Sequence, residues 1–169
     1  VHAQDRALGA VGGAAALASR HPRNRHLARR MAGERDAFRG VAPTLPTEPG
    51  YRPVPGRVLH VLTNSLPHTG SGYAQRSHAI LTSLRDEGFE VAAVTRPGYP
   101  VQIGVPWAAQ RDVVDGIGYA RLLPARLAQG QAARIQQHAE LLAAHVRRHR
   151  PALLHTTPHF LNALAVEAV

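Results

Sequence analysis

From residue 57 onward, short apolar runs alternate with longer helix-forming stretches, and this alternation constrains the fold more than any other feature of the chain. The runs are rich in β-branched and aliphatic residues and have the length of strands. They cover residues 58–63, 90–95, 117–123 and 152–156. Alternating strands and helices are typical of a parallel sheet with helices on both faces. We therefore predict an α/β fold with a Rossmann-like, doubly wound parallel sheet.

The stretches between these runs have the composition and periodicity of helices. Residues 72–87 are predicted to form one helix, which Gly88 ends as a C-terminal cap. Residues 131–148 show the clearest amphipathic pattern, with Ile135, Leu142 and Val146 on one face. A last helix is predicted over residues 158–169. Residues 96–115 contain Pro and Gly and are predicted to be a long loop, a kind of segment that often carries function.

The first 56 residues differ in character from the rest. Residues 7–19 are helix-permissive, and residues 23–38 read as a basic helix with Leu27, Met31 and Phe38 on one stripe. Either that stripe packs a solvated helix on the domain, or the basic face rests on an anionic membrane. Residues 43–56 contain five prolines and read as an extended linker. We predict an N-terminal helical extension (1–42), a linker (43–56) and a Rossmann-like domain (57–169) that is incomplete at its C-terminus.

Composition narrows the classes of function. The chain of 169 residues has no cysteine, which excludes disulfides and thiolate metal sites and suits a cytoplasmic protein. The net charge is +9, but aromatic residues make up only 5%, so stacking platforms for nucleic acid are poorly supplied and we expect no nucleic-acid partner. All basic residues are arginine, so a P-loop, which needs lysine, is excluded. No run approaches the ~20 apolar residues of a membrane span.

A glycine-containing loop, residues 64–72, follows the first predicted strand. Ligands of doubly wound folds sit at the carboxyl ends of strands, where this loop lies. Gly70, Ser71 and Gly72 allow close backbone approach, and the helix that begins there suits a phosphate. A dinucleotide-binding fingerprint would have a third glycine where this chain has Gln75. Arg96, after the second strand, could still bind the 2′-phosphate of NADP, so NADP remains an alternative ligand. A plain turn is the simpler alternative.

Further polar residues cluster at the same predicted sheet edge. Tyr73 and Arg76 share a face of the helix after the glycine loop, and the His78 imidazole on the same helix could carry a proton or donate a hydrogen bond. The alternative is that Arg76 is solvated and His78 is packed against a neighbour. His155 ends the last strand, with Thr157 and His159 behind it, but no carboxylate accompanies these histidines, so no metal site is expected. His60, inside the first strand, reads as a packed core histidine.

Taken in order, these motifs resemble a known family. They are VLHVL at 58–62, SLP at 65–67, GSGY at 70–73 with Arg76 and His78, LTSLRDEGFEVAAV at 81–94, DGI at 115–117, RP at 150–151, LLH at 153–155 and NALA at 162–165. Together, from residue 57 to the end, they resemble the N-terminal domain of family 4 glycosyltransferases, the retaining group with the GT-B fold. No single motif is diagnostic; their order and spacing carry the resemblance.

The resemblance implies a glycosyltransferase of the hexosyltransferase type that moves a sugar from a nucleotide diphosphate sugar with retention and needs no metal or other cofactor. This half would bind the acceptor, often lipid-linked in the family, which allows a peripheral contact with the inner face of the membrane. Its cleft would include Asn64, Tyr73, Arg76, His78, His155 and Thr157. The glycine loop would approach the donor phosphates, and a C-terminal domain outside this sequence would supply most nucleotide contacts and two glutamates.

One position departs from the family pattern. Many members carry a histidine near the donor sugar two residues after the position of His155, and this chain has Thr157 there. The sequence therefore assigns no catalytic residue, and we expect the chain to be inactive alone. Two alternatives stay open: an NADP-dependent enzyme fragment, and a basic module that binds anionic membrane or nucleic acid.

Overall fold

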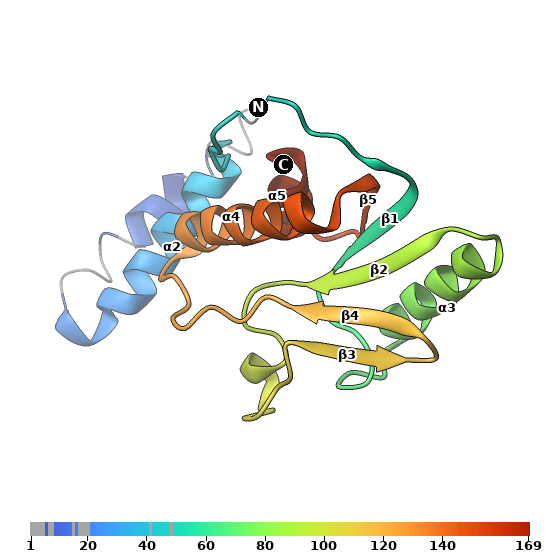
Figure 1. Cartoon of the computed structure of the whole chain (residues 1–169). Helices are drawn as coiled ribbons and strands as arrows, with labels where there is room; N and C mark the ends of the chain where they lie inside the picture. Colours follow the sequence, from blue (N-terminus) through green and yellow to red (C-terminus); the bar gives the residue numbers. More distant parts are fainter. Residues whose placement is uncertain (1–5, 7–8, 15, 17–20, 41, 48) are drawn as a thin grey trace.

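The computed structural model describes residues 6, 9–14, 16, 21–40, 42–47 and 49–169 (Figure 1). Five strands form one sheet in the order β3-β4-β2-β1-β5. The strands are β1 (Val54–Leu62), β2 (Glu90–Thr95), β3 (Arg111–Val114), β4 (Ile117–Arg121) and β5 (Pro151–Thr156). The helices are α2 (Arg25–Phe38), α3 (Gly72–Asp86), α4 (Gln131–His149) and α5 (Phe160–Glu167), with short 3-10 turns η1 (Pro22–Asn24) and η2 (Val101–Ile103).

Four of the strands are parallel, as predicted, and form a Rossmann-like sheet. β4, β2, β1 and β5 lie side by side, with β1 paired to β2 and β5. The chain thus moves from β1 toward one edge and then crosses back to the other side of β1, which makes the β1–β5 boundary the point where strand order reverses. In such sheets a crevice forms at this boundary, outside the carboxyl ends of the strands.

The fifth strand, β3, corrects the prediction that residues 96–115 form a loop. β3 pairs antiparallel with β4, and Asp115 and Gly116 connect the two. Both connecting residues have positive φ, +48° for Asp115 and +78° for Gly116, as a two-residue hairpin turn of type I′ requires. The Asp-Gly pair was therefore the available sequence signal, and the sheet is mostly rather than wholly parallel.

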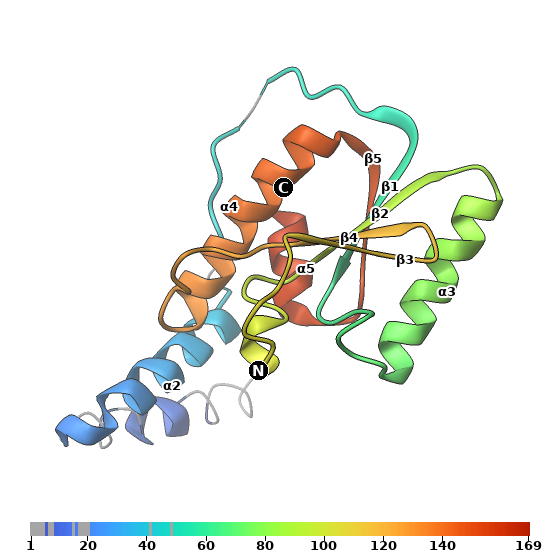
Figure 2. The same cartoon turned by 60° about the horizontal axis from the view of Figure 1, so that its bottom comes forward.

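Helices cover both faces of the sheet (Figure 2). On one face, Leu81 of α3 packs with Leu62 and Tyr119, which are at most 1% exposed. On the other, Leu142 of α4 and Ala165 of α5 pack on Leu59 and its neighbours. Successive residues of β1 thus enter different cores, because side chains alternate along a strand. This arrangement confirms the doubly wound reading.

Most predicted boundaries lie within a few residues of the observed ones. The predicted strand 90–95 is β2, and the helix predicted over 72–87 ends at Asp86, with Gly88 at φ +89° behind it. β1 begins earlier than predicted, at Val54, and an irregularity in its pairing with β5 falls between Val54 and Val58. The last residues of the predicted linker are therefore strand.

The basic helix of the extension packs against α4. Ala28 of α2 is buried, and a Cβ on Gly33 would lie only 2.7 Å from the backbone nitrogen of Gln131. Leu27, expected on the packed stripe, is instead 41% exposed. Gly33 thus lies against the start of α4, because only a residue without a Cβ allows so close an approach; the side chain of Phe38 lies outside the described residues. Of the helix predicted over 7–19, residues 9–14 and 16 are described and are helical; the others lie outside the described residues.

The predicted linker runs beside α4 rather than through open solvent. The amide of Thr44 donates to the side chain of Gln136, and the Gln136 amide group donates back to the Thr44 carbonyl, both at 2.9 Å. Leu45 packs against the core beneath α4. Among the described helices, none has the length and apolar character of a membrane span.

Candidate functional site

The loop after β1 lies at the carboxyl edge of the sheet and leads into α3. Ser71 caps the helix, its hydroxyl accepting from the amide of Ala74 at 3.3 Å. Gly70 and Gly72 are exposed, and a Cβ built on either would meet no described atom within 4 Å. The first amides of a helix lack acceptors within it. The loop therefore presents open backbone donors at the start of α3.

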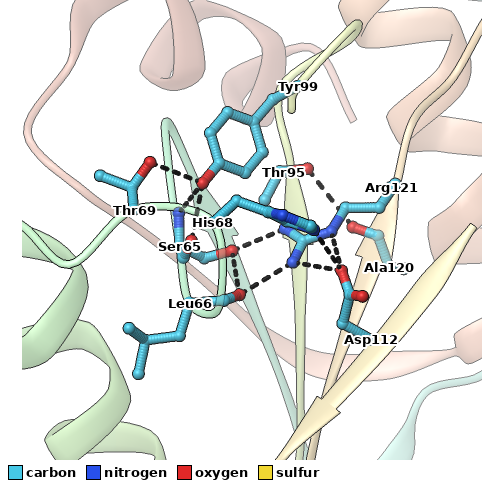
Figure 3. A network of polar contacts seen from close by, with 9 residues as sticks. All are labelled: Ser65, Leu66, His68, Thr69, Thr95, Tyr99, Asp112, Ala120 and Arg121. Atoms are coloured by element: carbon cyan, nitrogen blue, oxygen red, sulfur yellow. Dashed lines mark hydrogen bonds and ion pairs between the residues drawn. The ribbon is translucent and has the colours of Figure 1, made fainter. Parts of the chain in front are cut away.

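A buried arginine holds this loop in place (Figure 3). The Arg121 guanidinium, at the end of β4, donates to the Ser65 hydroxyl at 2.6 Å and to the Leu66 carbonyl at 2.8 Å. Its charge is balanced by Asp112 of β3, whose carboxylate lies 2.7 Å from the guanidinium. The Asp112 carboxylate also lies 3.2 Å from Nε2 of His68 in the loop. Strands β3 and β4 thus fix the shape of a loop that follows β1.

Tyr99 braces the same loop from the other side, as Figure 3 shows. Its hydroxyl donates to the Ser65 carbonyl at 2.7 Å, accepts from the Ser65 amide at 3.2 Å and lies 2.8 Å from the Thr69 hydroxyl. Its ring lies 5.3 Å from the Arg121 guanidinium, within cation–π range. These contacts fix the backbone that precedes the two glycines, so the loop is preorganised.

A pocket of about 270 Å³ opens beside this loop, between the ends of β1 and β5. Its wall combines hydroxyl, amide and imidazole groups with two rings. The lining residues are Thr63, Asn64, Tyr73, Ser77, Thr157, Pro158 and His159. We call it the switch-point pocket, because it lies where the strand order reverses. Such a wall offers hydrogen bonds and ring surface without a fixed carboxylate, which suits a hydroxyl-rich ligand.

The structure brings only some of the predicted site residues to this pocket. Asn64, Tyr73 and Thr157 line it, with the Tyr73 side chain 65% exposed. Arg76 is exposed on α3 and lies outside the pocket lining. The glycine loop adjoins the pocket through the first turn of α3. Three residues of the predicted cleft therefore line the pocket, and Arg76 directly precedes Ser77, which also lines it.

His78 points away from the pocket, toward the β3–β4 hairpin. Its Nδ1 lies 2.7 Å from the Tyr119 hydroxyl and its Nε2 lies 3.0 Å from the Asp115 carboxylate. Burial raises the pKa of Tyr119 to about 12, with Arg121 acting against the rise and Asp115 adding to it, so the phenol stays protonated. His78 thus connects α3 to the hairpin. This agrees with the alternative that His78 is packed against a neighbour.

His155 pairs with His60 on the adjacent strand. Their rings stack with centroids 4.1 Å apart. His60 is 1% exposed, and burial, aided by His155, lowers its pKa to about 4. His60 is therefore a neutral core histidine, as predicted. His155 is exposed and lies on the same face of the sheet as α3. It does not line the switch-point pocket.

Sequence reasoning missed Arg121, Asp112 and Tyr99, which together hold the glycine loop. Arg121 sits at the end of a predicted strand, but nothing in its surroundings along the chain distinguishes it from the other arginines. Asp112 and Tyr99 fell inside the predicted loop 96–115. Their roles depend on contacts between segments more than 30 residues apart, such as Tyr99 with Ser65, so sequence spacing gave no signal.

Two further observations bear on ligands and relatives. Among the described residues, no group of three or more His, Cys, Asp or Glu side chains lies close enough to hold a metal ion. No protein-family model matches the chain, and neither the curated proteins nor the solved structures that were searched gave a match.

Proposed function

We propose that this chain is the acceptor-binding half of a retaining glycosyltransferase that uses a nucleotide diphosphate sugar. The observation that carries the proposal is the switch-point pocket, which joins Asn64, Tyr73 and Thr157 beside a preorganised glycine loop. Ligands of doubly wound sheets bind at this place. The resemblance of residues 57–169 to family 4 glycosyltransferases supplies the reaction class.

The glycine loop would stabilise the departing nucleoside diphosphate. As the bond to the sugar breaks, negative charge grows on the diphosphate. Open amides at Gly70 and Gly72 and the positive end of α3 oppose that charge, and Arg76 adds a full positive charge on the next turn. Because Arg121 and Tyr99 hold the loop already in shape, these donors need no rearrangement during the reaction.

The pocket wall would orient the acceptor. Hydroxyl and amide groups of Thr157 and Asn64 can exchange hydrogen bonds with sugar hydroxyls, and the exposed ring of Tyr73 gives a flat apolar surface for a sugar face. Orientation of the attacking hydroxyl is a large part of catalysis in such transfers. A C-terminal domain, in this proposal, holds the nucleotide across the cleft.

The first test is nucleotide release by the protein that carries this domain together with its C-terminal partner domain. UDP-, GDP- and ADP-sugars are supplied with and without a cell-derived acceptor extract. We expect release from one donor class, raised by the extract. No release from any donor by folded protein would overturn the proposal and favour the basic binding module, which vesicle co-sedimentation then tests.

Matched variants assign the roles. Arg76→Ala is expected to lower turnover about tenfold or more, because one donor to the leaving group is lost. Tyr73→Ala should raise the acceptor KM, whereas Ile80→Ala, an exposed position on the same helix outside the pocket lining, should change neither constant. Unchanged turnover and donor affinity in Arg76→Ala would remove Arg76 from the mechanism.

A further inference from the structure

A second, smaller pocket of about 90 Å³ lies next to the switch-point pocket. Four segments form it: the loop after β2, the loop before α4, the first two turns of α4, and the start of α5. Its polar lining consists of Arg96, Gln102, Gln131, Arg134, Gln137, His138, His159 and Asn162. His159 lines both pockets, and the Asn162 amide group donates to the hydroxyls of Thr63 and Thr157, which line the larger one. We call the smaller one the α4 pocket.

Positive charge collects in the α4 pocket without a carboxylate. Its lining holds two arginines and two histidines and no Asp or Glu. Arg96 donates from Nε to the Thr63 carbonyl at 3.1 Å and from Nη1 to the side-chain oxygen of Gln102. Arg134 donates to the Ala128 carbonyl at 3.1 Å. Within the described part of the chain, neither arginine forms an ion pair with a carboxylate. Neutral groups hold both side chains and leave the charge unbalanced.

Arg134 lies close enough to Arg96 to repel its charge. Burial lowers the pKa of Arg96, and Arg134 lowers it further against the opposing effect of Tyr99. The N-terminus of α4 adds its partial positive charge, and its cap residue, Gly130, makes no side-chain hydrogen bond there. An anion in this pocket would relieve the repulsion and interact favourably with the helix.

His138 supplies an independent sign of a missing partner. The residue is 4% exposed, lines the pocket, and its Nε2 is buried without a hydrogen-bond partner among the described residues. Buried polar groups nearly always have a partner, because leaving one unpaired is costly. A neutral imidazole with a proton on Nε2 can donate to an oxygen placed in the pocket. In the tautomer that carries the proton on Nε2, the unpaired His138 and the uncompensated arginines favour the same kind of ligand.

From this geometry we infer that the α4 pocket binds a small oxyanionic group, a phosphate or a carboxylate, carried by the acceptor. The inference rests on the proposed function, since the acceptor is taken to occupy the adjoining switch-point pocket. Arg96 and Arg134 would bind the oxygens from two sides, and Nε2 of His138 would donate from the buried wall. The acceptor is then an anionic sugar or polyol, with its hydroxyl in one pocket and its anionic group in the other.

Inorganic phosphate tests the site without any transfer reaction. It is titrated into the isotope-labelled protein at constant ionic strength, set with sodium chloride, while the ring resonances of His138 are followed. We expect a saturable shift at His138, and about tenfold weaker binding in Arg134→Gln, because a charge-assisted contact is lost. Arg134 is exposed, so its replacement leaves the core intact; Arg148→Gln, on the last turn of the same helix, is the matched control and should bind as the parent does.

Acetate and glycerol 3-phosphate are the other probes. Tighter binding of either phosphate than of acetate assigns a phosphate to the acceptor, and the reverse order assigns a carboxylate. No saturable shift at His138 with any probe, or equal affinity in parent and Arg134→Gln, overturns the inference. Phosphate binding without sugar transfer would support the anion site in the α4 pocket and contradict the proposed function. Sugar transfer without anion binding would support the proposed function and contradict the anion site.

Discussion

The buried guanidinium of Arg121 donates to the hydroxyl of Ser65 across 2.6 Å, joining the end of β4 to the loop after β1. The two strands β4 and β1 are not neighbours in the sheet, because β2 lies between them. The contact therefore reaches over the carboxyl end of β2. It makes the position of the glycine loop depend on the β3–β4 hairpin, which supplies the balancing Asp112 carboxylate.

Replacing Arg121 with Met should destabilise the fold strongly. The change leaves the Asp112 carboxylate with only His68 as a partner and the Leu66 carbonyl with only the Ser65 hydroxyl as a donor. Breaking a buried pair in this way costs about 3–5 kcal/mol. Urea denaturation measures the loss. Arg148→Met, at an exposed position, should stay within about 0.5 kcal/mol of the parent. Equal stability of the two variants would contradict the bracing role of Arg121.

Tyr99→Phe removes one hydroxyl and keeps the ring. The Ser65 amide loses its acceptor and the Ser65 carbonyl loses a donor, so the free energy of unfolding should fall by about 1–3 kcal/mol. Hydrogen exchange at the Ser65 amide should accelerate. Tyr51→Phe, which loses a single bond to the Pro151 carbonyl elsewhere, should leave Ser65 exchange unchanged; faster exchange in both would mean that the effect is global.

Leucines on adjacent strands provide a test of the core. Leu59 in β1 is fully buried, whereas Leu153 in β5 is 57% exposed. Leu59→Ala should cost about 2–5 kcal/mol, through lost burial and a cavity under α4. Leu153→Ala should cost less than about 1 kcal/mol, which differential scanning calorimetry can resolve. A reversed order of melting temperatures would show that β5 is covered in solution.

Acid should destabilise the protein below neutral pH. Burial is the main cause that lowers the pKa of His60 and of His138 to about 4 in the fold, from 6.5 in the unfolded chain. The unfolded state binds protons first as pH falls below 6.5, so stability declines from there and the decline ends near pH 4, where the folded state also takes up protons. Urea midpoints at pH 7 and 5 should therefore differ, and His60→Leu should reduce the difference. A flat profile would contradict this assignment.

The approach of α2 to α4 depends on Gly33. A Cβ at this position would press on the backbone nitrogen of Gln131, which cannot move aside as a flexible side chain can. Gly33→Ala should therefore release α2 and raise hydrogen exchange throughout that helix while exchange in the sheet stays unchanged. Gly13→Ala, whose Cβ meets no described atom within 4 Å, is the control. Unaltered exchange in α2 would show that α2 does not need its close contact with α4 to stay helical.

The elements of the sheet were predictable because their signals are local. β2 shows as a β-branched run, α3 ends at a glycine that adopts positive φ, and α4 carries a long apolar stripe. β3 was missed because four residues with two valines give little periodicity, and the Asp115-Gly116 turn was read as part of a strand start. Leu27 was misplaced for a different reason: a glycine, Gly33, lies where α2 approaches α4 closely, and an apolar stripe does not reveal such a contact.

Residues of the candidate site could be predicted only where their place after a strand determines their position in the fold. Asn64 and Thr157 follow β1 and β5 directly, so parallel pairing brings them together. His78 could not be placed, because a shift of one residue along a helix turns a side chain by about 100°, and its partners Tyr119 and Asp115 lie far along the chain. Arg96 and His138 meet only through the packing of α4 on the sheet.

The order of the strands has a consequence for synthesis on the ribosome. β1 is made first among the strands, yet its pairing with β5 includes a hydrogen bond between residues 95 positions apart. Until β5 emerges, the nascent chain can form only a partial sheet in which the backbone edge of β1 is open, and such edges recruit other strands. Loop closure over this distance also slows folding. The interval between translation of β1 and of β5 is therefore the period in which this chain most needs a chaperone.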